Sequence, residues 1–277
     1  MRADLHTHTY FSDGMQSPEE LAKNAKAAGL TVLSVTDHDN MDGDAQKRIA
    51  VEGQGLVYIP GMEISAYEGT KIHVTGYNLN AESEAYLRFM RDRRAGAYER
   101  TEDIIKKLAA NGIFITMAEV EECRPVKQSP LHTMHVARAV AKKGYYRDEF
   151  TVYAECLRQG KFAYSDLHRP TPFEAVEVIH AAGGIASLAH PGRIEMERGE
   201  LERLLSRLKD SGLDGIEAVY STHTEEETAY FEALGKRYSL LITGGSDVHK
   251  ENVGGRRVGF PVFEPSFRLL EALGIAK

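Results

Sequence analysis

The sequence predicts an α/β protein in which the strands form a closed or nearly closed barrel, interrupted by a helical insertion. Predicted strands and helices alternate up to residue 81 and again from residue 170, which implies a parallel sheet with right-handed crossovers. Residues with metal-binding side chains lie at or near the C-terminal ends of six predicted strands. These ends converge around one axis in a barrel, whereas an open sheet collects ligands only at its switch point. A barrel is therefore favoured.

The first predicted strand is Arg2–His6, and the helix after it has clear signals at both ends. Ser17 fits the N-cap position with Glu20 three residues later, which is the pattern of a capping box. Pro18 fits the first helical position, and Gly29 fits the position just after the helix. A short helix at residues 45–51 and three strands complete this part of the chain, the strands at 30–39, 56–65 and 71–79.

The pattern changes at residue 82, and no convincing strand follows before residue 170. A long helical stretch covers residues 82–112, with a break expected near Gly96. Further helices are expected at residues 116–123, 132–144 and 148–160. We therefore expect residues 82–169 to form a helical insertion that contributes to the substrate pocket, and residues 1–81 and 170–277 to form the barrel.

Alternation resumes with a helix at residues 171–184, where Thr171 fits the N-cap and Pro172 the first helical position. The remaining helices are expected at residues 197–211 and 225–237, and the remaining strands at 184–192, 215–221 and 239–249. One helix separates each of these strands from the next, as parallel strands require.

The composition is that of a soluble globular protein, with 42% hydrophobic and 27% charged residues. The N-terminus lacks the apolar core of a signal peptide and no apolar run is long enough to span a bilayer, so we expect a cytoplasmic protein without membrane contact. Cys123 and Cys156 form no C-x-x-C pair, which argues against disulfide scaffolds and thiolate metal sites. A formal charge of −7 argues against an extended nucleic-acid surface. We expect a monomer or a small homo-oligomer.

His6 and His8 lie one residue apart at the end of the first predicted strand. Alternate strand residues point to the same face, so both imidazoles can bind one metal ion, although a surface turn explains an isolated pair equally well. Nine residues near strand ends have the side chains that divalent ions prefer: His6, His8, Asp13, His38, Glu63, His73, His190, Asp247 and His249. Nine ligands suit two or three ions, and imidazole with carboxylate fits Zn²⁺, Mn²⁺ or Fe²⁺ without choosing among them.

Six segments resemble, in order, the motifs of the PHP (polymerase and histidinol phosphatase) family: DLHTHTYFSDG, VTDHDNMDG, IPGMEIS, IHVTGY, AGGIASLAHPGR and GSDVH. The motifs extend from residue 4 to residue 249, so the resemblance covers nearly the whole chain. It implies a distorted seven-stranded (β/α)7 barrel with a two- or three-metal site. The insertion before the His-Pro motif resembles that of small stand-alone phosphoesterases that act on nucleotides.

The family pattern implies three metal positions, whose ligands in this chain are His6, His8, Glu63 and Asp247; Glu63, His73 and His190; and Asp13, His38 and His249. Glu63 would bridge the first two ions, which places it in the catalytic machinery. Two cations that share a hydroxide lower its pKa and hold the phosphate oxygens, so no protein nucleophile is needed. Asp13 stands where some relatives have histidine.

Five further residues are candidates for substrate contact. Arg193 follows the His-Pro-Gly motif and can bind a phosphate by a bidentate contact, the alternative being a solvated loop arginine. Three residues of the insertion resemble positions that face the active site, the alternative being an ordinary helix surface: His135, Arg138 and Lys161. His223 ends a strand and is either a proton donor to the leaving group or a surface histidine. The resemblance also implies a phosphate-binding arginine two residues before His135, where this chain has Thr133.

The expected activity is metal-dependent hydrolysis of a phosphate ester on a small nucleotide or phosphorylated sugar. The first candidate substrate is a 3′,5′-nucleoside bisphosphate or the end of a short RNA. The alternatives are a cyclic phosphodiesterase that opens a sugar cyclic phosphate and then releases phosphate, and a histidinol phosphatase. A metal-dependent C–N hydrolase would usually need a metal-bridging carbamylated lysine, and no lysine stands at a predicted strand end. An inactive binding module would be expected to have lost ligands, and none of the nine is missing.

Overall fold

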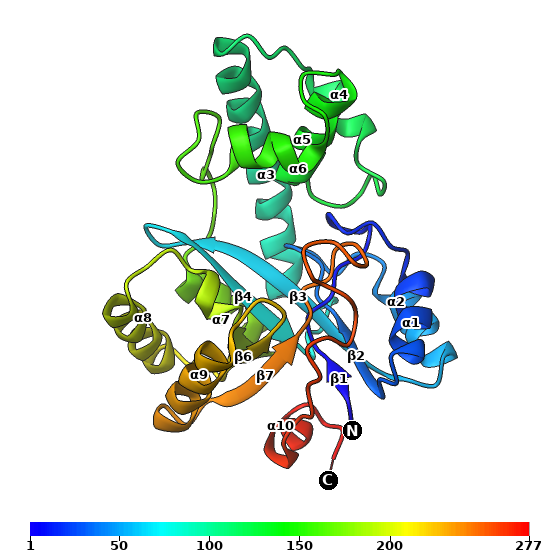
Figure 1. Ribbon diagram of the computed structural model, residues 1–277, viewed down its shortest axis with the longest axis vertical. Coiled ribbons are helices and arrows are strands. Elements are labelled where there is room, and N and C mark those ends of the chain that lie inside the picture. The colour runs from blue at the N-terminus through cyan, green and yellow to red at the C-terminus, as the bar shows by residue number, and fades with distance from the viewer. Residues whose placement is uncertain (277) are drawn as a thin grey trace.

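The computed structural model describes residues 1–276, in which seven strands form one sheet in chain order (Figure 1). The two edge strands meet through backbone hydrogen bonds, because Leu5 N donates to Gly244 O (3.1 Å) and Asp247 N donates to His6 O (2.8 Å). The sheet is therefore a nearly closed barrel, as predicted. Its strands are β1 (Ala3–Asp4), β2 (Val32–Val35), β3 (Val57–Tyr67), β4 (Lys71–Tyr77), β5 (Ile185–Leu188), β6 (Gly215–Tyr220) and β7 (Leu241–Gly245).

Helices surround the barrel, and a separate group of helices stands over one end of it (Figure 1). The surrounding helices are α1 (Pro18–Ala27), α2 (Asp44–Gly53), α7 (Pro172–Ala181), α8 (Arg198–Asp210), α9 (Glu225–Arg237) and α10 (Phe267–Ala272). The separate group is α3 (Glu84–Ala110), α4 (Met117–Glu122), α5 (Thr133–Lys142), α6 (Glu149–Val152) and the π-helical turn η1 (Tyr153–Leu157). None of the helices within residues 1–276 is long and apolar enough to cross a membrane.

Local signals placed several helix ends correctly. Ser17 accepts a hydrogen bond from Glu20 N at the start of α1, and the Glu20 side chain closes the capping box. Thr171 caps α7 in the same way, with Pro172 at the first helical position. Helix α10 has no counterpart among the predicted elements, and its Leu269 packs in the cluster of apolar residues that closes the barrel between β1 and β7.

The expectation of an entirely parallel sheet is wrong at β4, which runs antiparallel to both β3 and β5. Only three residues separate β3 from β4, and that length permits a hairpin but not a crossover. The hairpin pairs Ser65 with His73. His73 therefore lies near the start of its strand, not at the C-terminal end as expected, and the reversed direction still brings it to the same end of the barrel.

The first strand is shorter than expected, because β1 ends at Asp4 and not at His6. Beyond Asp4 the chain pairs with the segment after β7, as in the bridge between Thr7 and Val248. Asp4 supports this change, since its carboxylate accepts from Ser246 N (2.9 Å) and Gly259 N (2.8 Å). His6 and His8 are thus positioned by the closure of the barrel and not by a regular strand.

Helix α3 connects the barrel to the insertion. Its first half, with Phe89 and Met90, packs in the large apolar core of the barrel. Its second half, with Ile104 and Leu108, packs in a separate core formed within residues 97–163. The insertion therefore has its own core and is held over the barrel by one continuous helix.

The break expected near Gly96 is wrong, because α3 is continuous from Glu84 to Ala110. A Cβ atom at Gly96 would lie 2.5 Å from the Cβ atom of His168. Glycine is needed here for the close approach of the segment that returns from the insertion, and not for a change of helix direction.

Gly96→Ala should lower the free energy of unfolding by about 1–3 kcal/mol, the usual cost of overpacking. Urea denaturation measures it. Gly53→Ala in α2 is the matched control, because a Cβ there meets nothing within 4 Å. The control should be neutral or up to about 1 kcal/mol more stable. Equal stability of the two variants would contradict the close-packing explanation.

Candidate metal centre

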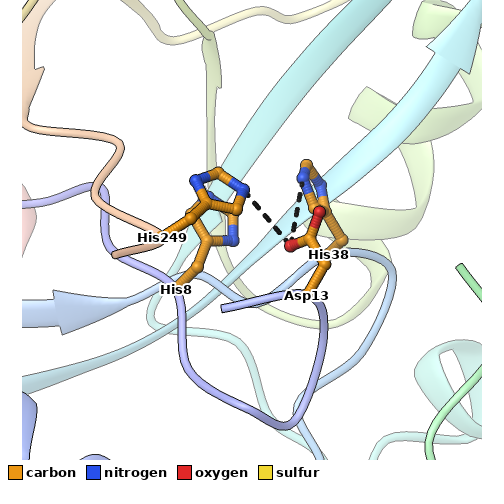
Figure 2. A group of neighbouring side chains, drawn as sticks. All are labelled: His8, Asp13, His38 and His249. Carbon is orange, nitrogen blue, oxygen red and sulfur yellow. Dashed lines mark ion pairs between the residues drawn. The ribbon is translucent and has the colours of Figure 1, made fainter. Parts of the chain in front are cut away.

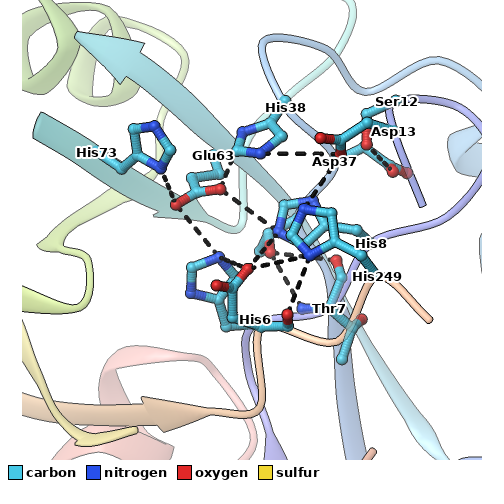
Figure 3. A network of polar contacts seen from close by, with 12 residues as sticks. His6, Thr7, His8, Ser12, Asp13, Asp37, His38, Glu63, His73 and His249 are labelled. Atoms are coloured by element: carbon cyan, nitrogen blue, oxygen red, sulfur yellow. Dashed lines mark hydrogen bonds and ion pairs between the residues drawn. The ribbon is translucent and has the colours of Figure 1, made fainter. Parts of the chain in front are cut away.

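Glu63 lies in the middle of β3 with its side chain fully buried, at the centre of a group of imidazoles (Figure 3). Its Oε1 atom is 2.6 Å from His73 Nδ1 and 2.9 Å from His190 Nε2. Its Oε2 atom is 2.9 Å from His38 Nδ1. The nearest nitrogens of His6 and His8 lie 3.3 and 3.4 Å from the same carboxylate. One carboxylate is therefore within reach of five histidines, the arrangement that a bridging ligand needs.

Eight of the nine predicted ligand residues fall into three overlapping groups, in each of which the ligand atoms lie within 4.8 Å of one another. The first group matches the set that the family pattern implies for one ion: His6, His8, Glu63 and Asp247. The second, shown in Figure 2, adds His8 to the implied set: His8, Asp13, His38 and His249. The third contains His38, Glu63 and His73. His190 is outside that third group but contacts Glu63, and its ring centroid is 5.0 Å from that of His73.

The donor atoms in these groups fit divalent cations, because several of them are buried and make no well-directed hydrogen bond, even where another atom of the cluster lies close by. Buried polar atoms in proteins are normally paired, so a cluster of unpaired ones needs an explanation. The unpaired atoms are His6 Nε2, both ring nitrogens of His8, Asp13 Oδ1, His38 Nδ1, Glu63 Oε2, His73 Nε2 and His190 Nδ1. All belong to residues of the predicted set, and imidazole nitrogen with carboxylate oxygen is a typical donor set for divalent transition metals.

The protonation states of two members of the cluster, Glu63 and His8, suit cation binding, whereas the neighbouring carboxylates raise the pKa of His38 to about 9 in the absence of a bound cation. Burial alone would raise the pKa of Glu63, but the neighbouring imidazoles of His73, His6 and His38 outweigh it and hold the pKa well below its ordinary value. Burial, reinforced by His249 and His38, lowers the pKa of His8 to about 4. Glu63 is thus charged and His8 neutral near neutral pH, and these are the forms that bind metal.

Asp37 and Asp39, which flank His38 in the chain, belong to none of the three groups. Asp37 accepts from the hydroxyls of Thr9 and Ser12, both at 2.6 Å, and pairs with the buried Lys47 ammonium at 2.6 Å. It therefore fixes the loop that carries Asp13. Asp39 pairs with Arg93 (3.2 Å) in the insertion.

Glu217, which is fully buried in β6, was not among the predicted site residues. Both of its carboxylate oxygens accept from His6 Nδ1, at 3.0 and 3.2 Å, and Oε2 also accepts from His190 N at 2.7 Å. A carboxylate behind a ligating histidine fixes the orientation of its ring and raises its basicity. The only signal in the sequence is a single acidic residue within the apolar strand GIEAVY.

A second missed group surrounds Asp247. The Tyr220 hydroxyl donates to Asp247 Oδ2 (2.6 Å) and accepts from Arg193 Nη1 (3.0 Å) and Arg256 Nη2 (2.8 Å). Arg193 Nη1 also lies 3.2 Å from Asp247 Oδ2. These contacts leave Asp247 Oδ1 facing His8 Nε2 at 3.2 Å.

A cavity of about 490 Å³ opens onto the cluster and is lined by both the barrel and the insertion. Of the predicted substrate residues, Arg138 and Arg193 line it. The other three are not among the described residues that line it. His135 is buried and bonded to His132 N and Ser12 O.

Lys161 is partly exposed and faces the exposed Glu155 at 3.9 Å. His223 accepts from Gly192 N (3.2 Å) and donates to Ala218 O (3.0 Å), so it supports the turn after His190. The geometry therefore gives no support to the predicted substrate roles of Lys161 and His135, or to the predicted catalytic role of His223.

Three comparisons place this chain among known proteins. The PHP domain model matches residues 4–102. The chain is 32% identical over 276 residues to a 3′,5′-nucleoside bisphosphate phosphatase of Chromobacterium violaceum, covering 97% of this chain and 96% of the relative. It is 32% identical over 247 residues to a 5′-3′ exoribonuclease of Haemophilus influenzae, covering 89% of each chain. It is 29% identical over 266 residues to a phosphoribosyl 1,2-cyclic phosphate 1,2-diphosphodiesterase of Eggerthella lenta, covering 95% and 99%.

Solved structures agree with this placement. A structure from Chromobacterium violaceum described as an amidohydrolase superposes with a TM-score of 0.87 at 29% identity, covering 99% of this chain and 97% of the other. A metal-dependent phosphoesterase structure from Bifidobacterium adolescentis superposes with a TM-score of 0.86 at 25% identity, covering 99% and 96%. The shared barrel, the cluster of imidazoles and carboxylates and the extent of these matches lead to one conclusion: the chain belongs to the PHP family and is a metal-dependent phosphoesterase.

Proposed function

We propose that the chain removes phosphate from a small nucleotide that carries a second phosphate, with a 3′,5′-nucleoside bisphosphate or the end of a short RNA as its substrate. The observation that carries this proposal is the charge of the cavity. Eight cationic side chains line it together with the metal-binding cluster: Lys71, Arg100, Arg138, Arg158, Arg169, Arg193, Lys250 and Arg256. Outside the predicted ligand set, the described acidic residues that line it are Asp39 and Glu195. A cavity of this size and sign suits a small, multiply charged anion.

The predicted ligand sets fit two or three divalent ions of Mn²⁺, Zn²⁺ or Fe²⁺. His6, His8, Glu63 and Asp247 would hold one ion, Glu63 would bridge to a second beside His73 and His190, and Asp13, His38 and His249 would hold a third. Such ions lower the pKa of water and neutralise phosphate oxygens, so the chain need not supply a nucleophile.

Residues of the chain itself position the metal ligands and the substrate phosphate. Tyr220 and Arg193 fix the carboxylate of Asp247, while nearly half of the Arg193 side chain stays exposed at the cavity, where it can contact a phosphate oxygen. Arg138 donates to Asp13 O (2.9 Å), which ties the insertion to the metal-binding loop. We propose that residues 82–169 supply one wall of the substrate pocket and that the barrel of residues 1–81 and 170–277 supplies the metal-binding floor.

The test compares adenosine 3′,5′-bisphosphate with adenosine 3′-monophosphate and 5′-monophosphate. The bisphosphate should have a kcat/KM value roughly ten- to hundredfold higher, the effect of one charge-assisted contact to the remote phosphate. Binding energy from that phosphate orients the reacting ester, so part of the difference should appear in kcat. Equal kcat/KM values for the bisphosphate and both monophosphates would refute the proposed substrate class and leave the phosphoesterase family assignment intact.

The relative from Eggerthella lenta gives a second candidate, a cyclic phosphodiesterase, because it matches 95% of this chain. One metal cluster can hold a cyclic diester and the monoester that its opening produces. A ribose cyclic phosphate in the same assay separates the two candidates. Faster release of phosphate from the cyclic compound than from the bisphosphate would favour the cyclic substrate.

A further inference from the structure

The side of the cavity formed by the insertion contains two arginines that the metal cluster does not use. Arg100 extends from α3, and Arg169 lies on the segment that returns from the insertion to the barrel. Tyr164, from the same returning segment, and Tyr153, from η1, line the cavity with them. None of these four residues was a predicted substrate residue, and none belongs to the three metal-binding groups.

The charge of these arginines is not neutralised by the protein around them. Arg100 is only 4% exposed, and its Nη1 atom donates to Leu167 O (3.2 Å), which uses one of its five N–H donors. Among residues 1–276, no carboxylate lies within 4.0 Å of either guanidinium. Burial and the neighbouring charges of Arg169 and Arg93 therefore lower the pKa of Arg100 to about 9.

Asp39 is the acidic residue that could neutralise these arginines, but it already has other partners. Asp39 accepts from Ser65 N at 2.8 Å through Oδ1 and from Arg93 Nη2 at 3.2 Å through Oδ2. Asp39 therefore pairs with Arg93 alone, and the group of Arg93, Arg100 and Arg169 keeps a net positive charge beside the cavity. Burying charge without a counterion is costly, so such an arrangement indicates that an anion completes it.

Two polar atoms beside the arginines also lack a partner. Arg169 Nε and the Tyr164 hydroxyl are both buried and make no hydrogen bond with the described protein. Both are donors, and a phosphate or similar oxyanion offers several acceptors at once. Tyr164 and Tyr153 line the same cavity as Arg169, and the positive charge of Arg169 acts to lower the pKa of both hydroxyls.

We infer that Arg100, Arg169 and the Tyr164 hydroxyl form the binding site for the second, unreacted phosphate of the substrate, while the metal cluster holds the phosphate that is cleaved. This inference rests on the proposed function. Asp39 follows His38 in the chain and contacts the arginine group through space, so the two sites lie at neighbouring positions along the cavity.

The experiment measures kcat and KM for adenosine 3′,5′-bisphosphate and for both monophosphates in the wild type, Arg169→Met and Tyr164→Phe. Arg169→Met should lower kcat/KM for the bisphosphate roughly ten- to hundredfold and change it for the monophosphates less than about twofold. Tyr164→Phe should act in the same direction with a smaller effect. Arg91→Met is the control, because Arg91 is exposed on the same helix as Arg100 and does not line the cavity.

Thermal melting separates binding from a structural role. Removing one of two neighbouring cations, of which Arg100 is buried, should leave the melting temperature of Arg169→Met unchanged or raise it, whereas loss of a structural arginine would lower it. If Arg169→Met does not fold, Arg169→Lys and Tyr164→Phe provide the same comparison. A wild-type preference for the bisphosphate that survives all these substitutions overturns the site and leaves the proposed function standing. No preference in the wild type overturns both.

Discussion

Glu63→Gln should abolish phosphoester hydrolysis and leave the barrel folded. The carboxylate of Glu63 lies within 3.4 Å of five imidazoles, and glutamine has neither its charge nor its second acceptor oxygen. We expect kcat/KM to fall on the order of 10³-fold, because the charge that the centre presents to the phosphate in the transition state depends on the ions that Glu63 helps to bind. Steady-state kinetics measures the loss, and elemental analysis of the purified protein should show less bound metal.

Glu68→Gln is the control for this substitution. Glu68 follows β3 at the surface of the molecule, where it contacts Arg207 at 3.5 Å, so its loss should change neither kinetics nor metal content measurably. Removing metal from the wild type with a chelator should reproduce the Glu63→Gln defect, and added Mn²⁺, Zn²⁺ or Fe²⁺ should reverse it only in the wild type. Wild-type metal content and activity in Glu63→Gln would show that the carboxylate does not bridge ions.

Features that depend on neighbouring residues in the chain were predicted well. The caps at Ser17 and Thr171 involve residues three positions apart, and both are present. The barrel itself was predicted because metal-binding residues lie at or near the ends of six predicted strands. Each of these strands and its polar residues can be recognised within a short segment of the sequence. The strands then follow one another in the barrel in chain order, and the one long connection, between β4 and β5, contains the insertion.

Features that depend on distant contacts were not predicted. Gly96 resembled a helix break, but its role is to admit His168, which is 72 positions later in the chain. His6 and His8 appeared to continue a strand, but their backbone pairs with the segment after β7. The direction of β4 was wrong because the alternation of strands and helices was taken to imply a parallel sheet throughout, although no helix was predicted between the strands at 56–65 and 71–79.

Contacts between residues far apart in the chain also limited the prediction of the site. The nine predicted ligands converge, since each follows or lies within a strand of the barrel. The sequence could not show which arginines would lack a counterion, because Arg88, Arg91, Arg93, Arg94 and Arg100 all lie on one polar helix. The structure separates them: Arg93 pairs with Asp39 and Arg94 with Asp42, while Arg100 is buried without a carboxylate within 4.0 Å among residues 1–276.

Glu217→Gln should weaken metal binding roughly ten- to hundredfold, the usual cost of losing the partner of a ligating histidine. Glu217 accepts from His6 Nδ1 through both oxygens and from His190 N through one of them. Glutamine keeps one acceptor, but its amide group donates and would face donors of His6 or His190. Competition with a metal-binding dye measures the affinity, and Glu225→Gln on the exposed start of α9 is the control.

The kcat value of Glu217→Gln, measured at increasing metal concentration, shows whether Glu217 orients the metal ligands or takes part in the reaction directly. If Glu217 acts by orienting His6, saturating metal should restore most of the kcat value of Glu217→Gln, because the reacting groups themselves are unchanged. Glu217→Ala should be less stable by about 1–3 kcal/mol, since His190 N would be left buried without an acceptor. A kcat value that stays low in Glu217→Gln at full metal occupancy would show that Glu217 acts on the reaction itself, and unchanged metal affinity would show that His6 does not need this carboxylate.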